Sequence, residues 1–237
     1  MSTDWAAYDQ SAMKTYGDSL PAPRRIRHVL ISAITSGDII PGARLKEAEL
    51  GQQLGVSRTP LREALAGLRA EGILSIGEDG GLRVRRLGYQ DIHALYQMRA
   101  TLEGLAAELA AAQASQAERA FIAETRLREA ELVARGAGPD ILADLNGRFH
   151  QGIILASHNP FLIETMQRLG TMMALLGPTA YSLTKRVKEI GTEHDIISKA
   201  IQLGDPAAAG AAARTHLNNA VKARLEIMAS SHARNID

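Results

Sequence analysis

The strongest constraint on the fold is the regular punctuation of the second half of the chain by glycine and proline. After Gly88, apolar residues recur at helical spacing, and the breaks fall at Gly- or Pro-containing stretches: 136–139, 159–160, 177–178 and 204–206. This pattern predicts helices joined by tight turns. We expect helices near 90–114, 116–135, 139–157, 160–177, 183–203 and 206–230, packed as an all-helical antiparallel bundle over residues 88–237.

The segment before Gly88 has another organisation. Residues 1–22 are polar and predict a flexible, irregular tail. Between residues 23 and 87, apolar spacing and turn residues predict these elements: helices over 24–36, about 45–54 and 57–71, then strands over 73–76 and 82–85 with Gly77, Gly80 and Gly81 in the turn. Three helices followed by a hairpin form a winged helix-turn-helix plan. The predicted fold class is therefore mainly α, with two domains.

The formal net charge of +1 conceals an uneven distribution. From Pro23 to Leu87 there are eleven Lys and Arg against seven Asp and Glu, whereas Gly88 to Asp237 has fifteen against sixteen. A basic excess in a small domain favours a polyanion partner, although a solvated basic face would have the same composition.

Several classes of site and partner are excluded by what the chain lacks. The chain has no cysteine, which excludes disulfides, thiolate metal sites and cysteine nucleophiles. No apolar run is long enough to cross a bilayer, and Met1 to Leu20 has no basic-then-apolar signal pattern. We therefore expect a cytoplasmic protein without a membrane partner.

The third predicted helix separates its apolar and polar residues. Its apolar residues share one face: Leu61, Ala64, Leu65 and Leu68. Its polar residues share the other: Arg58, Thr59, Arg62 and Arg69. Arg58 and Arg62 are one turn apart, so both guanidinium groups can face one major groove and contact guanine. An ordinary amphipathic helix has the same pattern, but the tight turn, the hairpin and the basic excess together favour DNA binding.

Three histidines have positions that predict convergence. His150 lies four residues after Asn146, so the two share a helix face. His194 and His216 each lie eleven residues from Asp205, so an antiparallel helical hairpin places them at equal height. Three imidazoles meeting inside a bundle predict a divalent metal site, with buried core histidines as the alternative.

The N-terminal motifs resemble the signature of the GntR superfamily of bacterial transcription regulators. The matching runs are 55–65 and 68–74, with a lead-in over 41–47. The resemblance implies that Arg58 and Arg62 read DNA and that Ser57 and Thr59 contact phosphates. It also implies DNA contacts by Arg44 in the lead-in and by a wing that enters the minor groove at Gly80 and Gly81.

The region from Asp91 to about Leu225 resembles the FCD ligand-binding domain of the FadR subfamily. The matching segments are 91–106, 146–150, 159–160, 193–194 and 214–217. The resemblance implies a metal site of one acidic residue and three histidines, here Asn146, His150, His194 and His216. An amide carries no charge, so a lower affinity or another preferred metal of the Zn, Ni or Mn class is expected.

Arg99 matches an arginine that faces the effector pocket in several relatives of this kind. The resemblance therefore implies that Arg99 pairs with the carboxylate of a small organic acid. The local alternative is an ion pair with Glu103, one helical turn further along.

The expected function is that of a homodimeric, ligand-responsive regulator, a repressor, that binds a double-stranded DNA operator. Two alternatives stay open: a metal-dependent enzyme using the three histidines, and a sensor of the metal ion itself. Against an enzyme, no Glu accompanies the histidines as a general base, and no Ser/His/Asp set or phosphate loop is present.

Overall fold

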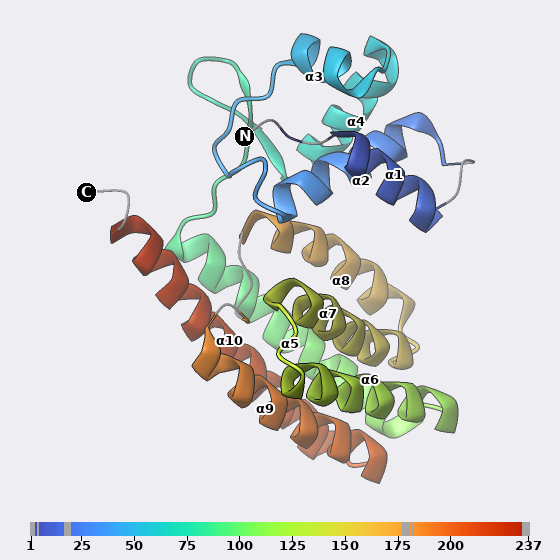
Figure 1. Ribbon diagram of the computed structural model, residues 1–237. Coiled ribbons are helices and arrows are strands. Elements are labelled where there is room, and N and C mark those ends of the chain that lie inside the picture. The colour runs from blue at the N-terminus through green and yellow to red at the C-terminus, as the bar shows by residue number, and fades with distance from the viewer. Residues whose placement is uncertain (1–2, 4, 17–19, 177–180, 182, 234–237) are drawn as a thin grey trace. The chain divides into compact units, whose positions relative to one another are not determined.

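The computed structural model describes residues 3, 5–16, 20–176, 181 and 183–233 of the chain. Two compact units emerge, Met1–Leu87 with Gly170–Pro178 and Gly88–Leu169 with Thr179–Asp237. Helices and one two-stranded hairpin make up the regular structure (Figure 1). Within the described ranges, no helix combines the length and apolar character needed to span a membrane.

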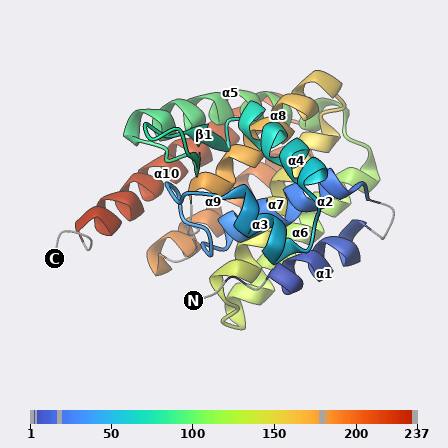
Figure 2. The same ribbon diagram turned by 90° about the horizontal axis from the view of Figure 1, so that it is seen from above.

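The N-terminal unit contains the predicted helices and hairpin in the predicted order. Its elements are α1 (Trp5–Tyr16), α2 (Ala22–Thr35), α3 (Glu47–Leu54), α4 (Arg58–Ala70), β1 (Leu74–Ile76) and β2 (Leu82–Val84). Gly55 has a left-handed backbone with φ 62°, which ends α3 and turns the chain directly into α4. Leu30 of α2 and Leu68 of α4 are fully buried between these helices, which lie close together in Figure 2.

The hairpin is extended by a segment that the sequence did not identify as a strand. β1 and β2 are antiparallel, with Leu74 opposite Val84. The backbone N–H of Gly42 donates to Val84 at 2.8 Å, and that of Leu45 donates to Leu82 at 2.8 Å. These bonds place Arg44, which lies between the two donors, opposite Arg83 of the wing.

Two features of the N-terminal unit differ from expectation. Residues 1–22 were expected to be irregular, but α1 is helical because distant residues hold it: the Tyr8 hydroxyl donates to Asp38 at 2.9 Å, and Asp9 pairs with Arg25 at 3.2 Å. The stretch 170–178 was placed in the second domain, yet its helical turn packs on α2 and groups it with the first unit. Neither contact is local in sequence.

The C-terminal unit contains the expected long helices. They are α5 (Tyr89–Gln113), α6 (Gln116–Ala134), α7 (Pro139–Ala156), α8 (Pro160–Met173, whose last turn belongs to the first unit), α9 (Thr184–Leu203) and α10 (Pro206–Ala233). The 3₁₀ turn η1 (Ala174–Leu176) follows α8, and the predicted break at Gly177-Pro178 lies outside the described residues. Buried alanines on α5 let α10 pack along it, and α9 lies beside α10 (Figures 1 and 2).

Candidate functional site

The first candidate site is the outward face of α4. The four apolar residues predicted to face inward are buried, and Arg58, Thr59 and Arg62 are exposed. Ser57 occupies the N-cap position as predicted, but its side chain makes no capping hydrogen bond. The first turn of α4 therefore presents polar side chains to solvent, as a recognition helix requires.

Acidic neighbours hold the arginines of this surface. Arg62 Nε lies 2.8 Å from Glu47 Oε2, and Asp79 lies 3.3 Å from Arg44 and 3.0 Å from Arg83. The Gly81 N–H and the Arg83 guanidinium, which both donate to Asp79, lower the pKa of that carboxyl. These exposed pairs are weak in water, so phosphate can replace the acids.

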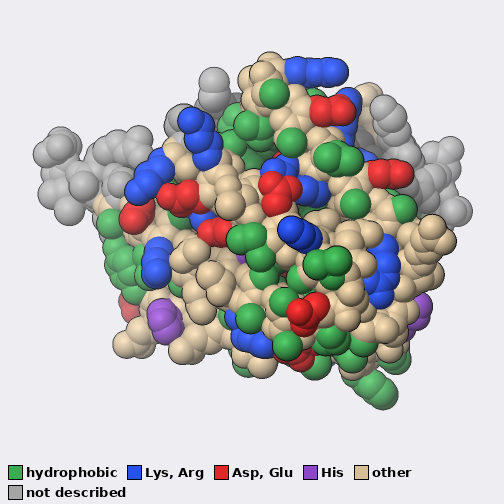
Figure 3. Space-filling model, turned by 90° about the horizontal axis from the view of Figure 1, so that it is seen from below, with side chains coloured by type: hydrophobic (Ala, Val, Ile, Leu, Met, Phe, Trp, Pro, Cys, Tyr) green, Lys and Arg blue, Asp and Glu red, His purple; other side chains and the backbone are tan. Residues whose placement is uncertain are grey.

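Mixed charge is also visible on the molecular surface. On the face shown in Figure 3, basic and acidic side chains are interspersed with apolar ones.

In the N-terminal unit, a groove of about 430 Å³ is lined by Arg62 and Arg69 of α4 and by Gly80 of the wing. Of the residues predicted to contact DNA, Arg62 and Gly80 therefore border one concave surface.

The second candidate site is the predicted histidine cluster. His150 of α7, His194 of α9 and His216 of α10 each offer a ring nitrogen, and these nitrogens lie within 4.8 Å of one another. His194 is fully buried and stacks on Phe149, with ring centroids 4.3 Å apart. The predicted convergence is confirmed, and the equal distances of His194 and His216 from the α9–α10 turn explain it.

Each imidazole faces a glutamate through Nδ1. The three contacts are His150 to Glu103 at 2.7 Å, His194 to Glu129 at 2.9 Å and His216 to Glu193 at 2.6 Å. An ionised carboxylate only accepts hydrogen bonds, so a neutral histidine in such a contact carries its proton on Nδ1. Nε2 is then the nitrogen available to a metal, and His194 Nε2 is buried without a hydrogen-bond partner among the described residues.

Burial and hydrogen bonding set the charges of this cluster. Burial lowers the pKa of His194, and it lowers the pKa of His216 to about 3. Burial opposes ionisation of Glu193, but hydrogen bonds from His216, Arg186 and Asn219 outweigh it and lower its pKa to about 2. Neutral imidazoles oriented by ionised carboxylates fit the requirements of a divalent cation.

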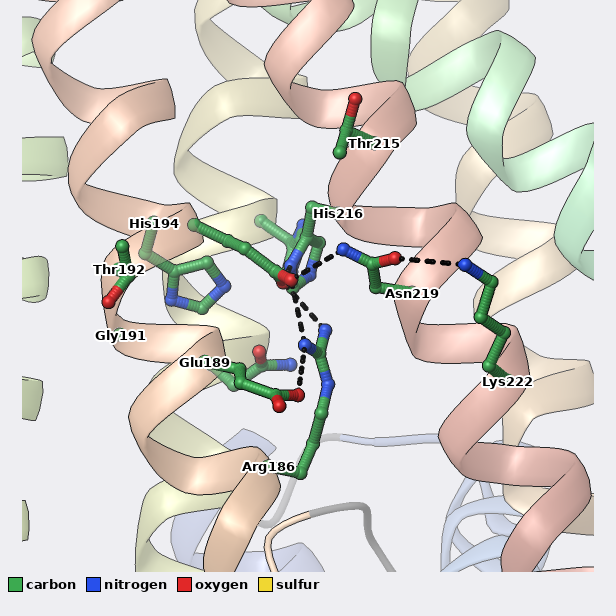
Figure 4. Close-up of polar contacts among 12 residues, drawn as sticks. Arg186, Glu189, Gly191, Thr192, His194, Thr215, His216, Asn219 and Lys222 are labelled. Carbon is green, nitrogen blue, oxygen red and sulfur yellow. Dashed lines mark hydrogen bonds and ion pairs between the residues drawn. The ribbon is translucent and has the colours of Figure 1, made fainter.

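An arginine completes each histidine–glutamate contact. The pairs are Arg99 with Glu103 at 2.8 Å, Arg126 with Glu129 at 3.6 Å and Arg186 with Glu193 at 2.6 Å. We call these groups the three His–Glu–Arg triads. In Figure 4, Arg186 of α9 and Asn219 of α10 point toward the region beside His216, where both donate to Glu193.

Sequence reasoning named Glu103 only as an alternative partner of Arg99, and it gave Glu129 and Glu193 no role. The available signal was the spacing within helices, because arginine and glutamate are four, three and seven residues apart in the three pairs. The histidine of each triad lies on another helix than its glutamate, so helical spacing contains no information about that contact.

Two predicted site residues have other partners. The Asn146 amide oxygen accepts from the Tyr181 hydroxyl at 3.4 Å, and the same hydroxyl donates to Glu129. Arg99 forms the local pair with Glu103 and lies 5.1 Å from the centre of the Tyr96 ring. The roles of Asn146 as a metal ligand and of Arg99 as an effector ligand stay predictions.

The space beside the cluster is small. A hollow of about 10 Å³ is lined by His150, Glu103 and apolar side chains that include Ile153 and Ile197. This volume is comparable to the space that one water molecule requires.

Two protein families match the chain. The family described as "Bacterial regulatory proteins, gntR family" matches residues 17–84, and the FCD domain family matches residues 94–219. The chain is 31% identical over 229 residues to the Glc operon transcriptional activator of Escherichia coli strain K12, covering 87% of this chain and 88% of that protein. It is 30% identical over 198 residues to a probable D-xylose utilization operon transcriptional repressor of Paenarthrobacter nicotinovorans, covering 81% and 84% respectively.

Solved structures share the fold. E. coli McbR/YncC superposes with a TM-score of 0.70 at 22% identity, covering 90% of this chain and 99% of that one. A putative transcriptional regulator GntR from Rhodococcus sp. RHA1 superposes with a TM-score of 0.67 at 24% identity, covering 86% and 97%. The predicted mainly α fold, with a helix-turn-helix region before a helical domain, is confirmed.

Proposed function

Because the chain belongs to the GntR family of bacterial transcription regulators and contains an FCD domain, we propose that it is a ligand-responsive repressor of a metabolic operon. The matched families and relatives are regulators and not enzymes, in agreement with the prediction. The observation that carries the proposal is the exposed row of Arg58, Thr59 and Arg62 on α4, beside the wing.

DNA recognition in this proposal uses a homodimer that presents two copies of α4 to two half-sites of an operator. Arg58 and Arg62 contact guanine bases, and Ser57 and Thr59 contact phosphates at the helix N-terminus. Gly80 and Gly81 of the wing approach the adjacent minor groove, and Arg44, which pairs beside the wing, contacts the same DNA.

Ligand sensing in this proposal uses the histidine cluster. Nε2 atoms of His150, His194 and His216 hold a divalent ion of the Zn, Ni or Mn class, with Asn146 as a candidate oxygen ligand. The bound ion supplies a Lewis-acidic position for a carboxylate. Arg99 is a second candidate partner of that carboxylate, which would compete with Glu103.

The test uses a DNA fragment from the promoter of the protein's own gene. We expect a mobility shift that weakens as salt rises, that Arg58→Ala reduces, and that one small organic acid in a panel reverses. An absent shift, or a shift that Arg58→Ala leaves unchanged, would contradict DNA recognition by α4. A shift that no acid reverses would contradict only the sensing part.

The small hollow beside His150 supports a second candidate function, a sensor of the metal ion itself. A space for about one water suits an ion more readily than an organic acid. In that case, adding Zn²⁺ or a chelator changes operator affinity in buffer that contains no organic acid. An unchanged affinity would exclude this candidate.

A further inference from the structure

The wing brings two arginines onto one acidic side chain. Arg44 and Arg83 lie opposite each other across the strands, and one carboxylate oxygen of Asp79 pairs with both. We infer that this arginine pair binds a phosphate of the DNA backbone and that Asp79 competes with that phosphate, which lowers the affinity for DNA of any sequence. The inference rests on the proposed DNA binding and adds Arg83 as a contact and Asp79 as an internal competitor.

Two arginines directly opposite each other attract an anion. Backbone hydrogen bonds on both sides fix Arg44 opposite Arg83, and like charges in such a cross-strand pair repel. Asp79 supplies a negative charge, because its Oδ2 lies 3.3 Å from Arg44 Nη1 and 3.0 Å from Arg83 Nη2. One negative charge faces two positive ones, so the arginine pair is only partly neutralised.

The turn of the wing accommodates this arrangement. The backbone N–H of Gly81 donates to Asp79 Oδ1 at 3.1 Å, which holds the carboxylate at the turn. A Cβ at position 77 would lie 2.7 Å from Arg83 Nε, and a Cβ at position 81 would lie 2.8 Å from Arg44 Nε. Glycine at both positions therefore leaves room for the two guanidinium groups to lie along the turn.

The arginine pair points away from the recognition helix α4. Successive side chains of a strand point to opposite sides. Leu82 lines the groove beside α4 and Val84 is buried, so Arg83 between them points away from α4. Arg44 points the same way, because residues directly opposite each other in an antiparallel pair share a face. A wing in a minor groove has a phosphate strand on each side, and the strand farther from α4 is the one that this pair faces.

A DNA phosphate fits the arginine pair better than Asp79 does. The side chains of Arg44, Arg83 and Asp79 are 50%, 37% and 40% exposed, and exposed ion pairs are weak, so their exchange costs little. Only one oxygen of Asp79 faces the arginines, since the other accepts from Gly81. A phosphate group presents two free oxygens, one for each guanidinium group. Removal of the Asp79 charge should therefore strengthen DNA binding.

The experiment compares wild type with Asp79→Asn on a random-sequence duplex and on the promoter fragment, by fluorescence anisotropy of labelled DNA at several salt concentrations. The amide keeps an oxygen that accepts from Gly81 and removes the charge. We expect affinity for both duplexes to rise by the same factor, about three- to tenfold at low salt, because two exposed ion pairs no longer compete. The logarithm of affinity should also fall more steeply with the logarithm of salt concentration, by up to about one in slope.

Matched variants show whether release of the arginine pair is the cause. Glu78→Gln removes the same charge from the same turn, at an exposed residue that forms no ion pair within the described part of the chain, and should raise affinity by less than about twofold. Arg83→Gln should lower affinity for both duplexes. Asp79→Asn added to Arg83→Gln should raise affinity by less than about twofold, because only Arg44 is then released. If Asp79→Asn does not fold, Asp79→Ser replaces it, since a hydroxyl also accepts from Gly81.

The outcomes separate this inference from the proposed function. An equal rise in Asp79→Asn and Glu78→Gln, a gain that persists undiminished in Arg83→Gln, or no gain in Asp79→Asn would overturn the inference and leave recognition by α4 intact. A gain confined to the promoter fragment would overturn it as well, because a phosphate contact is independent of sequence. An Arg58→Ala variant that binds the promoter as wild type does would overturn recognition by α4 alone. Absence of binding to either duplex would overturn both.

Discussion

Arginine–glutamate pairs occur in both units, and their surroundings give them opposite properties. Arg62 and Glu47 of the N-terminal unit lie 2.8 Å apart, with side chains 66% and 46% exposed. Arg186 and Glu193 of the C-terminal unit lie 2.6 Å apart, with side chains 4% and 14% exposed. Water competes for the first pair and is largely excluded from the second.

The difference shows how exposure selects a role for the same two residue types. An arginine that reads DNA has to exchange its acidic partner for a base or a phosphate, which an exposed pair permits. An arginine that fixes a histidine through a glutamate has to stay in place, which burial ensures. Four predictions probe this comparison.

The largest effect is expected from Arg186→Met. The substitution leaves the Glu193 carboxylate, whose side chain is 14% exposed, without its bidentate partner, and loss of one member of a buried pair costs up to about 3–5 kcal/mol. Urea unfolding measures this loss. The matched change at the exposed pair, Arg62→Met, should alter stability by less than about 0.5 kcal/mol. Equal losses in the two variants would mean that exposure does not distinguish the pairs.

Metal binding should stabilise the C-terminal unit through the oriented histidines. Zn²⁺ at one hundred times its dissociation constant raises the free energy of unfolding by about 2.7 kcal/mol. His194→Ala should abolish this gain, and His158→Ala, at an exposed position between α7 and α8, should retain it. A gain that survives in His194→Ala would place the ion elsewhere.

Arg62→Ala should affect DNA recognition without affecting the fold. Loss of a bidentate contact with guanine reduces discrimination between operator and altered operator by about 1–3 kcal/mol. Competition binding assays measure this ratio. Arg69→Ala removes an exposed charge from the last turn of the same helix and should leave the ratio unchanged. A similar loss in both variants would indicate a general charge effect.

The smallest effect is expected from Glu47→Gln, which removes the acidic partner of Arg62. Operator affinity should rise by a few fold, corresponding to less than about 1 kcal/mol. Glu49→Gln removes the same charge from the same helix, at a residue that pairs with Lys46. If Glu49→Gln raises affinity equally, release of Arg62 is not the cause.

Much of the fold follows from local signals. Helix ends could be predicted within a few residues because left-handed glycines such as Gly55 and Gly204 interrupt the chain at the positions where α3 and α9 end. Helix α1 lacked such a signal, since its stabilising contacts involve Asp38 and Arg25. Arg44 likewise reaches the wing through backbone bonds to β2 that no local pattern indicates.

In the candidate sites, too, some features follow from local sequence signals and others depend on tertiary packing. Helical periodicity alone predicts that Arg58 and Arg62 are exposed. It also predicts that each arginine of the triads lies on the same helix as its glutamate. Contacts between glutamate and histidine join α5 with α7, α6 with α9, and α9 with α10. Those contacts depend on how the helices pack, because a side chain's neighbours on another helix are determined by the core and not by spacing along the chain.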